Sequence, residues 1–441
     1  MAKTMADLPA VNFSGEDIMS GRFPALLAQA AIEHGPIFKW IITDGWEAGE
    51  YVFMVGPEAN RFVLHTGREH FSHDKGWTPL IGDTLGKGLL NMDDPMHARH
   101  RKMWNPAFTA AAMEAYIPVM QQVIADRTAA WPTQGIVDVY QESREITFDI
   151  AAAALGGFQR GLDVDRLREL FYTLLRFDDR IESWESYDKR FHEAQRELYI
   201  TLMRLIAERR ALPPDQQPHD VVGMIVRARD EDGQALSDEQ VLAHINILLV
   251  AGHETTTTLA SWMLYFIATQ PEQRRALEQE LESLAIDADT PAPVEALRAM
   301  KRLDAFLREV GRLYPPVINV PRGVISDYEF GGYQIPAGTP MRLSLAGSHL
   351  LPSVFTEPQK FDPERFLPPR DEERRTPYGL VTFGGGPRIC IGINFAQIEV
   401  KALAAHVLRR YNLEPTGPSV GHGGHWTAIL TDGVKLMVTA K

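Results

Sequence analysis

The segment Phe383-Gly-Gly-Gly-Pro-Arg-Ile-Cys-Ile-Gly392 lies directly ahead of a helix rich in alanine and apolar residues. Its three consecutive glycines allow positive φ angles and close backbone approach, so a flat ligand can lie against the loop. Pro387 stiffens the turn. The helix that starts near Gly392 places its positive end close to Cys390, and Arg388 adds a cation two residues away. These surroundings favour a thiolate at Cys390.

Cys390 is the single cysteine of the 441-residue chain. An intramolecular disulfide and a cysteine-rich zinc or iron–sulfur site are therefore excluded. A lone cysteine can be an inert part of the core, because a free thiol packs as a small hydrophobic group. It can also be a metal ligand. The glycines alone would suit a structural turn, but such a turn has little need of Arg388, so the loop favours the ligand.

A long helix is predicted from Ser237, where Ser237 and Gln240 form a capping-box pattern, and no proline interrupts it before Pro271. That is about thirty residues, or roughly 50 Å. A helix of this length with an apolar middle, residues 245–251, is expected to cross a large domain through its centre. Polar residues break the apolar run and argue against a membrane span, namely His244, Asn246, His253 and Glu254.

The remaining pattern predicts a mainly α fold with small β-sheets. Strands are expected in a hairpin at 38–43 and 51–55, between Val317 and Leu345, and in a hairpin at 426–438. Helices are expected from Pro95 onward, around Ser348 and from Ile393 to Leu413. We expect one domain, 1–441, with a largely β-containing N-terminal part at about 1–95 and a helical part at about 96–441.

Two charged motifs lie ahead of the cysteine loop. Glu309 and Arg312, in Leu307-Arg-Glu-Val-Gly-Arg312, are three residues apart and share one helix face, so they can pair. Taken alone, such a pair would be a solvated surface pair that contributes a few tenths of a kcal/mol. Arg365 lies in Phe361-Asp-Pro-Glu-Arg-Phe366. A second arginine would complete a buried charge network.

Phe383, Gly386, Arg388, Cys390 and Gly392 match, position for position, the haem-binding loop of the cytochrome P-450 superfamily, which the chain resembles over nearly its whole length. The resemblance implies the cytochrome P-450 fold, with the long helix crossing over haem b (iron protoporphyrin IX), and Cys390 as the iron ligand. It also implies that Glu309 and Arg312 are the family's Glu-x-x-Arg pair and that Arg365 joins them.

The same resemblance implies a set of haem contacts. His97 and Arg101, four residues apart, resemble the pair that holds a propionate, and Arg322 and Arg388 are two further cations. Carboxylates in an apolar pocket need charge-assisted partners. Phe383, Gly392 and Ala251 complete the cofactor-binding set. Three neighbours of His97 are expected at the surface, with a contribution to a basic docking site: Arg99, His100 and Lys102.

Ala251-Gly-His-Glu-Thr-Thr256 resembles the family's oxygen-binding groove, in the middle of the long helix. Splitting dioxygen requires protons, and Glu254 and Thr255 supply an acid and a hydroxyl. Small residues at Ala251 and Gly252 are expected to leave room above the iron. The alternative is that Thr255 and its neighbours form a polar helix stripe. For His253 a surface or water-network role is expected.

Together these features predict a haem-thiolate monooxygenase that inserts one atom of dioxygen into a lipophilic small molecule. Electrons are expected from a separate ferredoxin or flavodoxin with its reductase. The family's layout places the pocket at residues 71–90 and 171–177 and at four apolar positions: Leu248, Val317, Val320 and Ile429. A peroxide-driven peroxygenase could dispense with Glu254 and Thr255, and a haem-based gas sensor would need an output domain, for which no segment is evident.

The bulk properties agree with this interpretation. A formal net charge of -13 disfavours nucleic acid as a partner. Residues 1–17 contain no apolar stretch of the kind that a signal peptide or membrane span requires, so a cytoplasmic location is expected.

Overall fold

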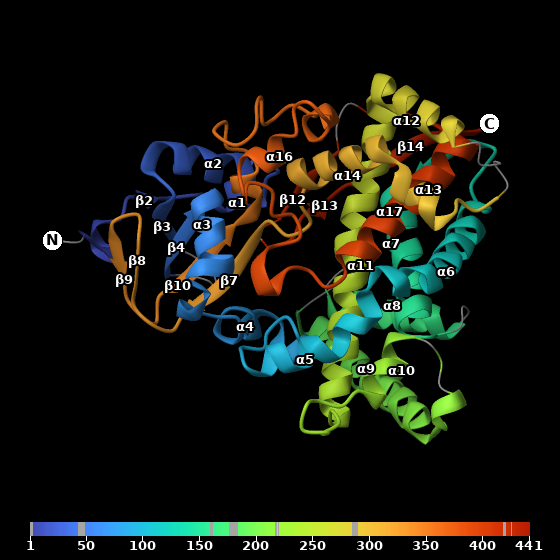
Figure 1. Cartoon of the computed structure of the whole chain (residues 1–441), viewed down its shortest axis with the longest axis horizontal. Helices are drawn as coiled ribbons and strands as arrows, with labels where there is room; N and C mark the ends of the chain where they lie inside the picture. The colour runs from blue at the N-terminus through green and yellow to red at the C-terminus, as the bar shows by residue number, and fades with distance from the viewer. Residues whose placement is uncertain are drawn as a thin grey trace. The chain divides into compact units, whose positions relative to one another are not determined.

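A computed structural model describes residues 3–42, 49–158, 162–175, 184–216, 218, 220–284, 290–417, 420–424 and 426–441. Contacts divide the chain into two units, and we describe each by itself (Figure 1). The sheet unit comprises Met1–Gly76, Ile124–Arg144 and Thr255–Lys441. The helical unit comprises Trp77–Val123 and Glu145–Glu254. Four helices continue across these limits: α4 (Asp74–Leu85), α6 (Ala110–Thr128), α7 (Val139–Ile150) and α11 (Asp238–Thr269).

The largest sheet of the sheet unit has the strand order β2-β3-β4-β10-β7-β5. Its strands are β2 (Ala10–Val11), β3 (Ile37–Ile42), β4 (Gly49–Val55), β5 (Phe71–Ser72), β7 (Asn319–Val324) and β10 (Pro340–Ser344). The predicted hairpin is confirmed, because β3 pairs antiparallel with β4; residues 43–48 lie outside the described part. β4 is central and pairs parallel with β10 on its other side, which explains its apolar run Val52–Val55.

Three smaller sheets belong to the same unit, in the orders β1-β9-β8, β11-β14-β6 and β12-β13. Their strands are β1 (Lys3–Thr4), β6 (Gln134–Asp138), β8 (Tyr328–Phe330), β9 (Tyr333–Ile335), β11 (Tyr411–Pro415), β12 (His422–Gly423), β13 (Ile429–Leu430) and β14 (Lys435–Ala440). The unit's own helices are α1 (Gly15–Met19), α2 (Phe23–His34), α3 (Pro57–Arg61), α12 (Pro271–Ser283), α13 (Val294–Ala299), α14 (Lys301–Leu313), α15 (Leu345–Ser348), α16 (Glu372–Arg375) and α17 (Ile393–Arg410).

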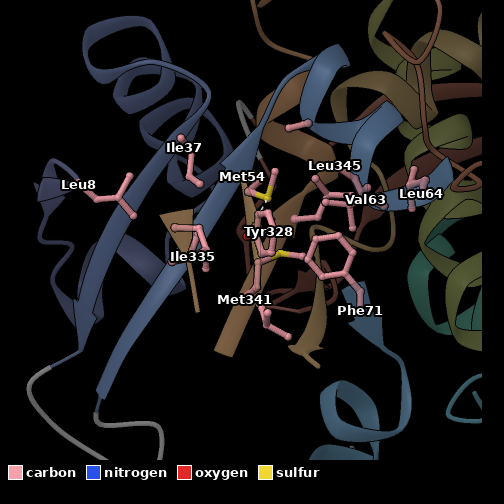
Figure 2. Close-up of a cluster of buried hydrophobic side chains, with 14 of the residues drawn as sticks. Leu8, Ile37, Met54, Val63, Leu64, Phe71, Tyr328, Ile335, Met341 and Leu345 are labelled. Atoms are coloured by element: carbon pink, nitrogen blue, oxygen red, sulfur yellow. Dashed lines mark hydrogen bonds between the residues drawn. The ribbon is translucent and has the colours of Figure 1, made fainter. Parts of the chain in front are cut away.

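An apolar core fixes the large sheet against its helices. Figure 2 shows Met54 of β4 and Met341 of β10 beside Tyr328, in a cluster that also contains Val63 and Leu64, which follow α3. Met54 and Met341 are fully buried there, and the Tyr328 hydroxyl lies 3.6 Å from the Met54 sulfur. Burying each such side chain contributes about 1.5–3 kcal/mol. Because Leu64 belongs to this core and also contacts the cysteine loop, the core gives that loop a rigid support.

The helical unit adds α5 (Met96–Trp104), α8 (Leu162–Leu174), α9 (Trp184–Ala211) and α10 (Val221–Arg227) to its parts of the shared helices. The predicted start of the long helix is confirmed: the Gln240 amide donates to Ser237 Oγ at 3.2 Å, and the Ser237 amide donates to Gln240 Oε1 at 2.9 Å. Among the described residues, no helix is both long and apolar enough to span a bilayer.

Two expectations for the C-terminal region are wrong. Helix α17 ends at Arg410 and not at Leu413, because Tyr411–Pro415 leave the helix to pair with β14. Residues 426–438 do not form one hairpin either. β13 pairs with β12, which shortly precedes it in the chain, whereas β14 pairs with β11 and with β6, which is distant in sequence. Turn residues predict where a chain reverses, but not which strand it will join.

Candidate active site

The cysteine loop holds its thiol at the first turn of a helix. The Cys390 amide donates to the Phe383 carbonyl at 2.9 Å, which closes the loop. Gly392 is the N-cap of α17, and a Cβ at this position would lie 3.9 Å from Cys390 Sγ. The side chain of Cys390 is exposed. A thiolate at this point is stabilised by the unpaired amides of the helix terminus.

Gly386 explains why the loop needs glycine. Its φ angle is +62°, and a Cβ at this position would lie 2.2 Å from the carbonyl oxygen of Leu64. The close approach excludes a side chain, and the positive φ angle disfavours one. Gly386 also begins the short 3₁₀ helix Gly386–Arg388, whose last residue supplies the cation predicted beside the thiol. The loop therefore packs directly on the sheet unit's core.

The predicted charge network is present and completely buried. Glu309, Arg312 and Arg365 have no exposed surface. Arg312 binds the Glu309 carboxylate through Nε at 2.7 Å and Nη2 at 2.9 Å, and Arg365 Nε lies 3.1 Å from both carboxylate oxygens. The amide of Asp362 donates to Glu309 Oε1 at 2.7 Å. The surface-pair alternative is therefore wrong for Glu309 and Arg312.

A further acid, Glu372, belongs to this network and was not predicted. Its Oε2 accepts from Arg365 Nη1 at 2.8 Å, and its Oε1 accepts from Arg370 Nη2 at 2.7 Å. Burial raises the pKa of Glu372, but hydrogen bonds from Arg370, Thr356 and Arg365 outweigh this effect, so the net pKa is lowered. Two carboxylates thus balance the buried arginines. No local pattern marks Glu372, because its partners are defined only by the fold.

His349 connects the network to the cysteine loop and was also missed. Its Nδ1 lies 3.1 Å from the Arg312 carbonyl, and the amide of Val381 donates to its Nε2 at 2.9 Å. These partners fit one neutral tautomer, with the proton on Nδ1. Complete burial, together with the nearby Arg312 charge, lowers the pKa of His349 to about 3. His349 therefore stays neutral and fixes the segment at Val381 that leads into the cysteine loop.

The four cationic side chains that are predicted to bind the haem propionates come from three separate segments of the chain. His97 and Arg101 lie one turn apart on α5 in the helical unit. His97 is buried, with Nδ1 3.5 Å from Asp94 Oδ1, and Arg101 Nε donates to Asn105 Oδ1 at 3.2 Å. Arg322 lies on β7 in the sheet unit and is only 4% exposed, and Arg388 precedes Cys390 in the loop. Their role at a cofactor stays a prediction.

The expectation that His100 lies at the surface is wrong. Its Nδ1 lies 2.8 Å from His244 Nε2, and both rings are buried within the helical unit. Burial lowers the pKa of His244 to about 3, and the neighbouring His100 adds to this effect. This neutral pair attaches α5 to α11, so it holds the helix that carries His97 and Arg101. Arg99 and Lys102 are exposed, as expected, and pair with Asp230 and Glu231.

The groove motif lies in α11, in which Glu254 ends the helical unit's share and Thr255 begins the sheet unit's share. Ala251 is exposed. Gly252 instead faces the helix segment Ala151–Leu155, where a Cβ would lie 3.3 Å from Leu155, so its small size serves packing. This differs from the expectation that both small residues leave room above the iron.

His253 is fully buried, so a surface role is wrong for it. Its ring lies between Phe148, at 5.2 Å edge to face, and Tyr172, at 6.0 Å in a stacked arrangement. Its Nε2 lies 2.7 Å from Glu254 Oε1. The predicted acid of the groove therefore lies at ion-pair distance from a neighbouring imidazole, without hydrogen-bond geometry between these two atoms.

The positions predicted for the substrate pocket are divided between the units. Leu248 is buried in the helical unit. In the sheet unit, Val317 forms an isolated β-bridge with Thr427, and the amide of Ala428 donates to the Pro316 carbonyl. Val317 therefore lies beside the segment that leads to Ile429. Val320 packs against the large core. Of the predicted segment 171–177, residues 176 and 177 lie outside the described part.

The residues present fit a haem. A thiol is exposed at a helix terminus beside a loop whose glycines permit close approach, and a buried guanidinium, Arg322, offers the kind of donor that a propionate requires. Cys390 would hold the iron, and Arg322, Arg388, His97 and Arg101 would hold the propionates. A thiolate-ligated haem supplies the activation of dioxygen.

Comparison with known proteins agrees with this site and fold. The sequence model of the family described as Cytochrome P450 matches residues 15–422. A putative cytochrome P450 136 of Mycobacterium tuberculosis is 30% identical over 377 residues, which cover 83% of this chain and 75% of that protein. A sterol 14alpha-demethylase of Mycolicibacterium vanbaalenii is 28% identical and covers 84% of this chain and 83% of its own length.

A solved structure of a retinoic acid bound cyanobacterial CYP120A1 matches all of this chain and all of its own, with a TM-score of 0.85 and 27% identity. The loop at Cys390 and the buried Glu-x-x-Arg network place this chain in the class of thiolate-ligated haem proteins. The chain belongs to the cytochrome P450 family. It is a haem-thiolate monooxygenase that acts with dioxygen on a small molecule.

Proposed function

We propose that this monooxygenase hydroxylates or epoxidises a lipophilic small molecule, that its cofactor is haem b, and that a separate ferredoxin or flavodoxin with its reductase supplies the electrons. The observation that carries the proposal is the exposed Cys390 thiol at the N-terminus of α17, beside a glycine loop that packs on Leu64. It supports a flat iron-containing ligand bound from the side of the loop.

A lipophilic substrate is supported by the apolar character of the four pocket positions Leu248, Val317, Val320 and Ile429. Similar proteins agree in chemistry, because one is a sterol 14alpha-demethylase and a structural neighbour contains retinoic acid. Sterols, retinoids and fatty acids are therefore the first classes to test.

The residues of α11 supply the protons that the reaction consumes. Glu254 is 19% exposed at its side chain, so it can exchange protons with solvent, and its Oε1 lies 2.7 Å from His253 Nε2. Thr255 follows it in the helix and is partly exposed. In the proposal, Glu254 takes protons from water, and the Thr255 hydroxyl orients one at its Oγ1 toward the reacting oxygen. This pair favours the dioxygen-dependent reaction over a peroxide-driven one.

Docking of an electron donor is supported by exposed cations. Lys102 is 71% exposed at its side chain and Arg99 is 52% exposed, although both pair with acids of the 230–232 segment. Arg409 and Arg410, in the last turn of α17, are partly buried, and Arg409 donates to the carbonyl oxygens of Ala405 and Thr290. An acidic ferredoxin or flavodoxin would compete with those internal acids. Its association should weaken as salt rises.

The test is turnover under ¹⁸O₂ with NADPH, a ferredoxin and its reductase, against a panel of a sterol, a retinoid and a fatty acid. We expect one product that contains a single ¹⁸O atom, and a rate that falls as salt rises. Product formed equally well with hydrogen peroxide in the absence of reductase would support the peroxygenase instead. Oxygen derived only from water would contradict both.

A further inference from the structure

A cavity of about 730 Å³ lies within the helical unit, among α4, α9 and the first turns of α11. Ligand pockets typically measure about 300–1,000 Å³. Six residues of the segment 71–90, at positions 82–87, line this cavity, but none of the four single positions proposed for the substrate pocket does. It shares residues 82–87 with the predicted pocket segment and differs from that pocket in the face of α11 that it contacts.

The cavity has an apolar floor, and a hydrogen bond joins two of the helices that form its walls. Leu85, Leu198 and Ala243 are buried and form its floor. The side-chain amide of Gln195 on α9 donates to the Asp83 carbonyl on α4 at 2.7 Å, which joins two of its walls. This hydrogen bond holds α4 and α9 in place on either side of the cavity.

Asn246 is the polar group of this floor. It is 9% exposed and lines the cavity, and among the described residues its Oδ1 has no hydrogen-bond partner. Asn246 interrupts the apolar run Ile245–Ala251, so nothing in the helix itself requires an amide there. A buried amide atom without a partner costs free energy, and such a cost persists where a ligand supplies the partner. The carboxamide can face either a donor or an acceptor.

The cavity lies on a different face of α11 from the groove. Successive residues of an α-helix are rotated by about 100°, so Leu248 is turned by about 160° from Asn246, and Ala251 by about 140°. Glu239, Ala243 and Asn246 share the cavity face at three- and four-residue spacing. A molecule in the cavity would thus contact the helix on the side opposite to Leu248 and Ala251.

The charges at the rim are balanced. Lys87 and Arg196 are cationic, Asp83 and Glu239 are anionic, and all four are exposed. A rim with equal numbers of each sign gives no net attraction to an ion. The floor and rim together select an uncharged molecule that is apolar apart from one hydrogen-bonding group.

We infer that this cavity is a second ligand-binding site, for a neutral lipophilic molecule whose hydroxyl or carbonyl group is bound by Asn246. The site goes beyond the proposed function and does not depend on which substrate is oxidised. Tyr199 closes one side of it and is 48% exposed, as expected of a side chain that a ligand would cover.

The experiment uses the haem-loaded protein and the neutral ketone Prodan as the probe, measured by equilibrium dialysis. An azole that coordinates the iron, kept at saturation as judged by the Soret shift, occupies the reaction pocket. We expect one Prodan per chain to remain bound under these conditions. Loss of all Prodan binding on azole saturation would overturn the inference while leaving the proposed function intact.

Two variants test the location. Tyr199→Ala should weaken Prodan binding about fivefold, whereas Ile200→Ala should leave it unchanged, because Ile200 is the next residue of α9, is 51% exposed and does not line the cavity. Asn246→Leu should also weaken binding about fivefold, and it should raise the melting temperature, because it removes a buried amide without a partner. Equal effects of Tyr199→Ala and Ile200→Ala, or a melting temperature lowered by Asn246→Leu with binding unchanged, would refute the site.

Discussion

Glu309→Gln removes the negative charge on which two buried arginines converge. The carboxylate accepts two hydrogen bonds from Arg312, two from Arg365 and one from the amide of Asp362. Glutamine keeps one acceptor oxygen but turns an NH₂ group toward guanidinium donors. Breaking a buried pair in this way costs roughly 3–5 kcal/mol. That is a large part of a folding free energy of about 5–15 kcal/mol.

The chain provides a matched control for this substitution. Glu364 Oε1 lies 2.7 Å from Arg302 Nη1, a distance equal to that of the shortest Glu309–Arg312 contact, but both side chains are nearly half exposed. Glu364→Gln should therefore cost about 0–1 kcal/mol. The assay is urea unfolding followed by far-ultraviolet circular dichroism. If the two variants shifted the midpoint equally, burial of the network would not be what makes it stabilising.

Three further predictions concern the groove, the loop and the response to pH. Thr255→Ala should keep haem and fold but divert NADPH-derived electrons from product to hydrogen peroxide. Glu254→Gln should instead slow NADPH consumption. An unchanged yield of product per NADPH in Thr255→Ala would show that Thr255 is a structural residue. Gly386→Ala should prevent haem loading, which is judged by the Soret band. Gly15→Ala should not prevent it, because Gly15 has open space around it. Equal haem loading in the two variants would contradict the close-packed loop. Because the pKa of His349 is lowered to about 3 in the folded chain from about 6.5 when unfolded, its contribution to stability is complete above pH 6.5 and falls by about 1.4 kcal/mol per unit as the pH decreases toward 3. His349→Gln should reduce that slope in pH-dependent melting, and an identical slope would refute the assignment.

The sequence predicts features that are encoded locally. Ser237 and Gln240 form the capping box where it was expected, because the motif and its hydrogen bonds lie within one turn. Glu309 and Arg312 pair because residues three apart share a helix face. The loop at Cys390 contains glycines at positive φ angles, which other residues adopt less readily. In each case the residue and its reason are close in the chain.

Features that depend on distant partners were missed. His100 is buried because His244, 144 residues away, meets its ring, and the pattern of α5 alone gives no sign of this. His349 connects Arg312 to Val381, which lie 37 and 32 residues away from it in the chain. The same limit explains the C-terminal strands, because β14 pairs with β6 rather than with its neighbour β13. Burial and strand pairing are properties of the assembled fold.

The central claim is that Cys390 ligates the iron through its sulfur. Its most direct test is the spectrum of the reduced, haem-loaded protein with carbon monoxide. We predict the strongly red-shifted Soret band of a thiolate-ligated haem, and its loss in Cys390→Ser, because Cys390 is the single cysteine of the chain. A wild-type spectrum typical of histidine ligation would contradict the account.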